Sequence, residues 1–82
     1  MVTVKYTSKL RVDLGREKDR VQAKTVADLI AELDRRYGHS FTGWMPSCKI
    51  FLNGSSLADR KGQDTALADG DEIVFLLPVA GG

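Results

Sequence analysis

The last residues of the sequence have types that suit a chemical step. Pro78 is followed by Val79, Ala80, Gly81 and Gly82. Glycine has no Cβ, so Gly81 and Gly82 can thread a narrow channel and leave the Gly82 carboxylate open to attack from either face. Four residues beyond a proline reach about 13 Å when extended, enough to enter a partner's pocket. A free carboxylate is a poor electrophile, so Gly82 would have to be activated before a nucleophile could attack it.

The segment before this tail is predicted to hold it in place. Glu72–Leu77 is apolar on both faces, which is typical of a strand in the centre of a sheet. A turn over 67–71 leads into this strand, and Pro78 ends it because proline cannot donate to a ladder. We therefore expect a folded domain over residues 1–78 and a flexible tail over residues 79–82.

The first strand and the helix are also predicted from their spacing. Apolar residues alternate over 2–6, which indicates a half-buried strand. The polar stretch 8–19 predicts a turn. Residues 20–23 are predicted to form a second strand, which would pair with the first as a hairpin. Apolar residues recur at three- and four-residue spacing over 26–37, with Thr25 as cap and Gly38 as stop. The sequence thus predicts a hairpin followed by a helix.

After the helix, residues 38–48 are predicted to form a loop, broken by Gly43 and Pro46. Lys49–Leu52 follows as a short strand, and Asn53-Gly54 closes it with a turn. The order of elements places the chain in the α+β class.

The segment Ala68-Asp-Gly-Asp-Glu-Ile-Val-Phe-Leu-Leu-Pro-Val-Ala-Gly-Gly82 resembles the C-terminus of the MoaD/ThiS sulfur-carrier family. In particular it is similar to the small subunit of molybdopterin synthase. The acidic turn, the apolar strand, the proline and the terminal glycines match in order and in distance from the end. The resemblance implies a β-grasp (ubiquitin-like) fold, with a mixed four- to five-stranded sheet and one main helix on one face.

The same resemblance implies a carrier protein without catalytic groups of its own. A ubiquitin-activating-like adenylyltransferase would use ATP and Mg²⁺ to adenylate Gly82, and no cofactor would be bound tightly by the carrier itself. A sulfur donor would then leave a thiocarboxylate, which a larger synthase subunit would present to a pterin precursor in molybdopterin synthesis.

Three alternatives stay open at this point. The family's molybdopterin-type members often have Pro-Pro where this chain has Leu77-Pro78, so sulfur delivery for thiamine or cysteine synthesis is an alternative pathway. A ubiquitin-like modifier joined to other proteins through Gly82 would use the same tail. A plain β-grasp interaction domain would not need Gly82 at all.

A partner surface is predicted on the face of the sheet that the single helix leaves uncovered. Leu76 is placed at the centre of this surface, with Phe51 beside it, and Pro78, Val79 and Ala80 guide the tail. Phe41 and Trp44, in the loop after the helix, are assigned to packing.

Composition excludes several other classes. The chain has 82 residues, a net charge of +1, no motif typical of nucleic-acid binding and no apolar stretch long enough to span a bilayer, so neither nucleic acid nor membrane is expected as a partner. The basic residues between Lys5 and Lys24 are interpreted as a solvated face, with an acidic partner as the alternative. One cysteine, Cys48, and one histidine, His39, cannot form a closed zinc site, so no metal is expected. The single cysteine favours a cytoplasmic location and is interpreted as a small buried hydrophobic residue.

Overall fold

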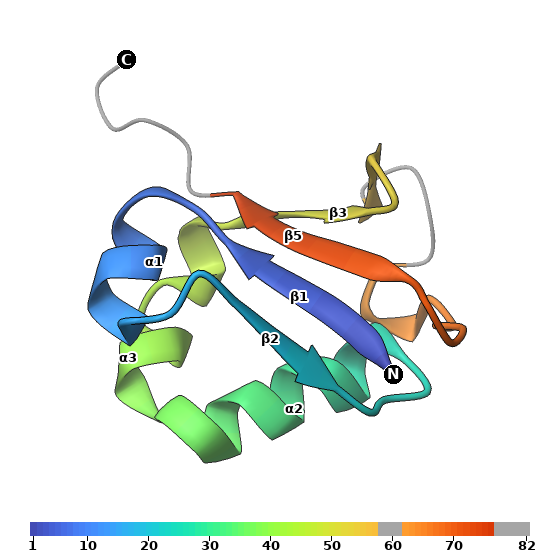
Figure 1. Cartoon of the computed structure of the whole chain (residues 1–82), viewed down its shortest axis with the longest axis horizontal. Coiled ribbons are helices and arrows are strands. Elements are labelled where there is room, and N and C mark those ends of the chain that lie inside the picture. Colours follow the sequence, from blue (N-terminus) through green and yellow to red (C-terminus); the bar gives the residue numbers. More distant parts are fainter. Residues whose placement is uncertain (58–61, 77–82) are drawn as a thin grey trace.

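The computed structural model describes residues 1–57 and 62–76 (Figure 1). The predicted tail residues Pro78, Val79, Ala80, Gly81 and Gly82 lie outside these ranges, as does Leu77. Two 3₁₀ turns, Met45–Ser47 and Gly62–Asp64, join the main elements. In chain order the helices and strands are β1 (Val2–Tyr6), α1 (Ser8–Leu14), β2 (Lys18–Val21), α2 (Val26–Tyr37), α3 (His39–Thr42), β3 (Lys49–Leu52), β4 (Ser55–Ser56) and β5 (Glu72–Leu76).

Five strands form one mixed sheet in the order β2-β1-β5-β3-β4. β1 pairs with β5 in parallel, and the other neighbours are antiparallel. The helix α2 lies across one face of this sheet (Figure 1). The structure therefore has the predicted β-grasp arrangement, with β5 in the centre.

The main helix begins and ends where the sequence predicts. The Thr25 hydroxyl accepts a hydrogen bond from the Asp28 N–H at 3.2 Å, which satisfies one of the free donors of the first turn. At the other end Gly38 has φ of 60°, a conformation that glycine adopts without strain, and its N–H donates to the Asp34 carbonyl at 2.7 Å. The predicted cap and stop are both confirmed.

The core lies between α2 and the covered face of the sheet. Alternate residues of β5, Ile73 and Phe75, are fully buried there, and Phe41 packs edge to face on Phe75 with ring centroids 5.4 Å apart. The packing role predicted for Phe41 is confirmed. The remaining core residues are Val2, Val4, Tyr6, Leu10, Val21, Val26, Leu29, Leu33, Leu52 and Leu57.

Within the first 25 residues, the predicted turn was wrong, and the predicted second strand begins earlier than expected. Residues 8–14 form the helix α1, where a turn was expected, because Leu10 and Leu14 are four residues apart and both pack on the core. Gly15, with φ of 69°, ends this helix. The second strand exists but begins at Lys18, two residues before the predicted start.

Two further elements were absent from the sequence interpretation. The predicted loop 38–48 contains α3, which packs against α1 and α2, followed by a 3₁₀ turn. The turn at Asn53 and Gly54 is confirmed, and it leads into a two-residue strand, β4, at the edge of the sheet.

A buried carboxylate joins the first hairpin to the main helix. Asp19 accepts hydrogen bonds from the Tyr6 hydroxyl at 2.9 Å and from the Tyr37 hydroxyl, and Arg16 Nε lies 2.8 Å from it. Burial, and then the hydrogen bond to Asp19, raise the pKa of both tyrosine hydroxyls, so they remain donors. Because the buried charge has three partners, it connects β1, β2 and α2 without leaving an unpaired group.

The last turns of α2 carry a second carboxylate cluster on the surface. Arg35 and Arg36 both donate to Glu32, and these hydrogen bonds lower its pKa from the ordinary value of 4.5 to about 2. A lowered pKa in the folded state means that the ionised form stabilises the fold. This contribution is complete above pH 4.5 and is lost as the pH falls towards 2.

The variant Glu32→Gln should therefore flatten the acid limb of the stability curve. Between about pH 5 and about pH 3 the wild type should lose more free energy of unfolding than the variant, as measured by urea titration with circular dichroism. Glu17→Gln is the control, because Glu17 is an exposed acid without an ion pair among residues 1–57 and 62–76. Equal acid sensitivity in the wild type and Glu32→Gln would contradict the cluster's contribution.

Candidate functional site

The structure places the base of the predicted site at the end of β5. Of the predicted site residues it describes Leu76 and Phe51. Gly82, Gly81, Ala80, Val79 and Pro78 lie outside the described residues. The site can therefore be built upward to the last described residue, Leu76.

The end of β5 is held by its two neighbouring strands and by side-chain contacts. Phe75 is opposite Tyr6 on β1 and Ile50 on β3. The Thr7 hydroxyl donates to the Phe75 carbonyl at 2.9 Å, and the Tyr6 and Phe75 rings stack with centroids 6.3 Å apart. These contacts hold the end of β5 in place in the sheet.

The uncovered face of the sheet carries an apolar strip that ends at Leu76. Phe51 pairs with Val74 across β3 and β5, and directly opposed residues point to the same face. Val74 and Phe51 are half-buried, and Leu76 is 38% exposed. We call Phe51, Val74 and Leu76 the apolar strip. The predicted location of Leu76 and Phe51 on one uncovered face is confirmed, while their role in binding a partner stays a prediction.

Cations surround the apolar strip. Lys49 is opposite Leu76, and Lys5 is opposite Val74, so both share the face of the strip. On β2, Lys18 and Arg20 extend the same face outward. The one acid that the strands place here is Glu72, whose carboxylate lies 3.2 Å from Lys5 Nζ. The sequence showed these charges, but the strand register was needed to place them on one face.

Two of the pockets in the described part of the chain lie at opposite ends of β1. A pocket of about 440 Å³ lies beside the end of β1, and Lys5, Thr7, Arg11, Lys18 and Val74 contribute to its lining. This pocket adjoins the point where the chain leaves β5.

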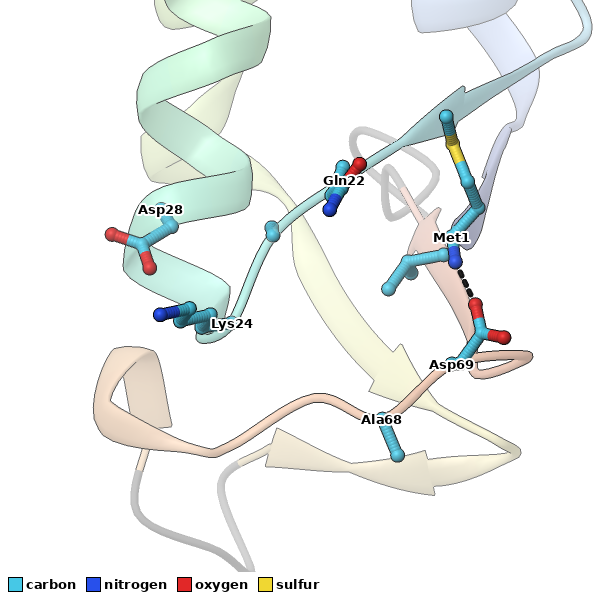
Figure 2. Close-up of a pocket in the computed structure, with 8 residues that line it drawn as sticks. Met1, Gln22, Lys24, Asp28, Ala68 and Asp69 are labelled. Carbon is cyan, nitrogen blue, oxygen red and sulfur yellow. Dashed lines mark hydrogen bonds and ion pairs between the residues drawn. The ribbon is translucent and has the colours of Figure 1, made fainter.

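A second pocket, of about 510 Å³, lies at the opposite end, where β1 begins. Figure 2 shows its lining, with the Met1 amine bonded to Asp69, and with Lys24 and Asp28 across the opening. Because β1 and β5 are parallel, this pocket lies about five strand residues, or roughly 15 Å, from the end of β5. We therefore assign the candidate site to the pocket of about 440 Å³ beside Lys5 and Val74, together with the apolar strip.

Cys48 does not have the surroundings of an activated thiol. It is half-buried against the core, and burial raises the pKa of its thiol. The interpretation as a small hydrophobic residue is supported. Trp44 is also half-buried against the core, and its indole N–H donates to Asp13 at 2.5 Å.

Among residues 1–57 and 62–76 there is no group of three or more side chains that could hold a metal ion. In the same ranges, none of the helices is long and apolar enough to cross a bilayer.

Comparison with known proteins gives a family match over nearly the whole chain. Residues 4–82 match the ThiS family. The curated proteins contain no sequence that matches. CysO from Mycobacterium tuberculosis is 27% identical, with a TM-score of 0.83 over 96% of this chain and 100% of that one.

Two further solved structures are similar at the same level. SAMP1, a small archaeal modifier protein from Methanosarcina acetivorans, is 27% identical, with a TM-score of 0.85 over 99% of this chain and 95% of its own. A chain from the complex of subunits 1 and 2 of the Helicobacter pylori molybdopterin-converting factor is 28% identical, with a TM-score of 0.75 over 99% and 97%.

Neighbouring residues of β5 should respond differently to truncation. Phe75→Ala removes a fully buried ring and should lower the free energy of unfolding by about 3–5 kcal/mol. Leu76→Ala should change it by less than about 1 kcal/mol, because that side chain is 38% exposed. Urea titration followed by tryptophan fluorescence measures both. A large loss in Leu76→Ala would show that Leu76 belongs to the core and not to an accessible face.

Proposed function

The chain belongs to the ThiS family of ubiquitin-like sulfur carriers, and we propose that it carries sulfur as a thiocarboxylate on Gly82. The observation that carries this proposal is the family match, which runs through the whole tail to Gly82. The fixed end of β5 at Leu76 supports it, because a held exit point lets a partner receive the tail in one direction.

The first step that we propose is activation of Gly82. Its carboxylate attacks the α-phosphate of ATP on an adenylating partner, pyrophosphate leaves, and an acyl-adenylate forms. The partner supplies ATP, Mg²⁺ and the catalytic groups. The chain supplies the carboxylate and two glycines without side chains, which suit a narrow active-site channel.

The second step replaces AMP with sulfur. A sulfide-donating nucleophile attacks the acyl carbon, the bond to AMP breaks, and a thiocarboxylate remains on Gly82. We propose a pterin precursor on a larger synthase subunit as the acceptor, which is molybdopterin synthesis. Support comes from the tail motif and from the 28% identity to a chain of the Helicobacter pylori complex. Sulfur delivery for cysteine or thiamine synthesis is the alternative, because Leu77-Pro78 departs from the Pro-Pro of the molybdopterin-type members.

We propose that partners bind through the apolar strip. Leu76 lies directly before the tail, and Val74 and Phe51 continue the strip across two strands. Burying these side chains against a partner would remove apolar area from water at the point where the tail must enter that partner.

Conjugation to other proteins is the second candidate function. It is favoured by the likeness to SAMP1, a modifier protein, at 27% identity over 99% of this chain. The same activated Gly82 would then be attacked by a lysine amine. Lysates of the host, probed for conjugates that disappear on deletion of Gly82, separate this function from sulfur transfer.

Incubation with ATP, Mg²⁺, the host's adenylating protein and a sulfide source should change the intact mass. The expected gain corresponds to one oxygen replaced by sulfur, and deletion of Gly82 should abolish it. Deletion of Gly82 removes none of the residues 1–57 and 62–76 that the structure describes, so retained urea stability serves as the control for folding. An unmodified wild-type terminus, where a known ThiS-family carrier is converted, would refute the carrier proposal.

Cys48→Ala should leave the extent of conversion unchanged, because the half-buried thiol is held protonated. The same mass assay measures this variant. Loss of this mass gain in Cys48→Ala, with the fold intact, would contradict the interpretation of Cys48 as a residue with only a packing role.

A further inference from the structure

We propose that the basic edge of the uncovered face docks an acidic surface of the adenylating partner. The basic edge comprises Lys5, Lys18 and Arg20 of that face, together with Arg11 of α1, which lines the same pocket as Lys5 and Lys18. This inference rests on the proposed function, because it names the charge of the surface that the partner presents beside the tail's entrance.

The first observation is a pair of like charges at the closest distance that a sheet allows. Lys5 and Lys18 are directly opposite each other across the antiparallel pair β1–β2. Their Cβ atoms are therefore about 5 Å apart on the same face, an arrangement that destabilises a strand pair. Arg20 adds a third cation to this face, opposite Thr3.

The second observation is that the fold offsets little of this repulsion. Lys5 has one ion pair, with Glu72 at 3.2 Å. Lys18, Arg20 and Arg11 are exposed, and within residues 1–57 and 62–76 none of them has an ion pair. Asp19, on the same strand, faces the core and is occupied by Tyr6, Tyr37 and Arg16.

The third observation is the hollow between these cations. Lys5, Arg11 and Lys18 line the pocket of about 440 Å³ beside the end of β5, with the Thr7 and Val74 side chains in its lining. One acid, Glu17, is present against three cations. A carboxylate side chain from outside would meet opposite charge there, and the apolar strip begins at Val74 in the same wall.

These observations together specify the partner's chemistry. A complementary surface has an apolar ridge that covers the strip and carboxylates that lie over the basic edge. Such carboxylates relieve the repulsion between Lys5 and Lys18, so the arrangement disfavours the isolated domain and favours the complex. Local arrangements that reduce the stability of a domain are typical of functional surfaces.

The variant Lys18→Glu should stabilise the isolated domain and weaken its binding to the adenylating partner. A glutamate opposite Lys5 should raise the thermal midpoint by about 2–4 °C. The same variant should raise the KM for this protein about fivefold in ATP–pyrophosphate exchange catalysed by the host's adenylating protein at low salt. Added salt should shrink the difference between variant and wild type, because exposed charges are screened.

Lys24→Glu is the matched control. It makes the same change of charge, but Lys24 lines the pocket at the opposite end of the sheet (Figure 2). Its KM should equal that of the wild type, which separates a docking contact from an effect of net charge.

Each outcome of this experiment decides the inference. A raised KM in Lys18→Glu alone, with a raised midpoint, supports it. Equal KM values in Lys18→Glu, Lys24→Glu and wild type would overturn it and leave the sulfur-carrier function intact. Concentration-dependent dimerisation in sedimentation, lost in Lys18→Glu, would assign the face to a second copy and also overturn it. Exchange that is absent with wild type refutes the proposed function itself, and the inference with it.

Discussion

The parallel pairing of β1 with β5 is the constraint on which the rest of the structure depends. It brings Thr3 opposite Glu72 and Tyr6 opposite Phe75, and it places β5 between two hydrogen-bonded neighbours. The buried side chains of both strands then face α2, while the alternate ones form the uncovered face. Because β5 is fixed along its length, the point where the chain leaves the sheet is fixed as well. The apolar strip and the basic edge both take their positions from this register.

Charged side chains are stabilised differently on the two faces of the sheet. On the covered face Asp19 is buried, and three donors satisfy its carboxylate. A buried charge without such partners would cost several kcal/mol, so the hydrogen-bond network is a condition for the fold. On the uncovered face water screens the lysines, and like charges can lie opposite each other at a small cost. Because solvent keeps their mutual repulsion small, like charges can be gathered on this face, where they can attract an oppositely charged partner.

The elements with a strong period could be predicted from the sequence. The helix α2 has a long apolar stripe, a cap at Thr25 and a stop at Gly38, and β5 is apolar on both faces, so local pattern and tertiary role agree. The helix α1 has only Leu10 and Leu14 to anchor it, and its stability comes from packing that a local pattern does not show. Alternation within the last strand separated Leu76 from Ile73 and Phe75, but the β3–β5 register was needed to establish that Phe51 shares its face. The pairing of Lys5 with Lys18 depends on the register of the first hairpin. Its second strand begins at Lys18, two residues earlier than predicted, so the predicted strands did not place these charges together.

The pairing of the first strand with the last also sets the order of events during synthesis. β1 leaves the ribosome first, but its parallel neighbour is β5. Pairing these two strands closes a long loop, which is slow because the chain loses conformational entropy before the contact forms. Until Glu72–Leu76 has left the exit tunnel, one edge of β1 has no strand beside it and the core lacks Ile73 and Phe75. The core can therefore be completed only after β5 is available. A chain that terminates before β5 exposes apolar strands to proteolysis, so a folded domain indicates that translation has passed β5.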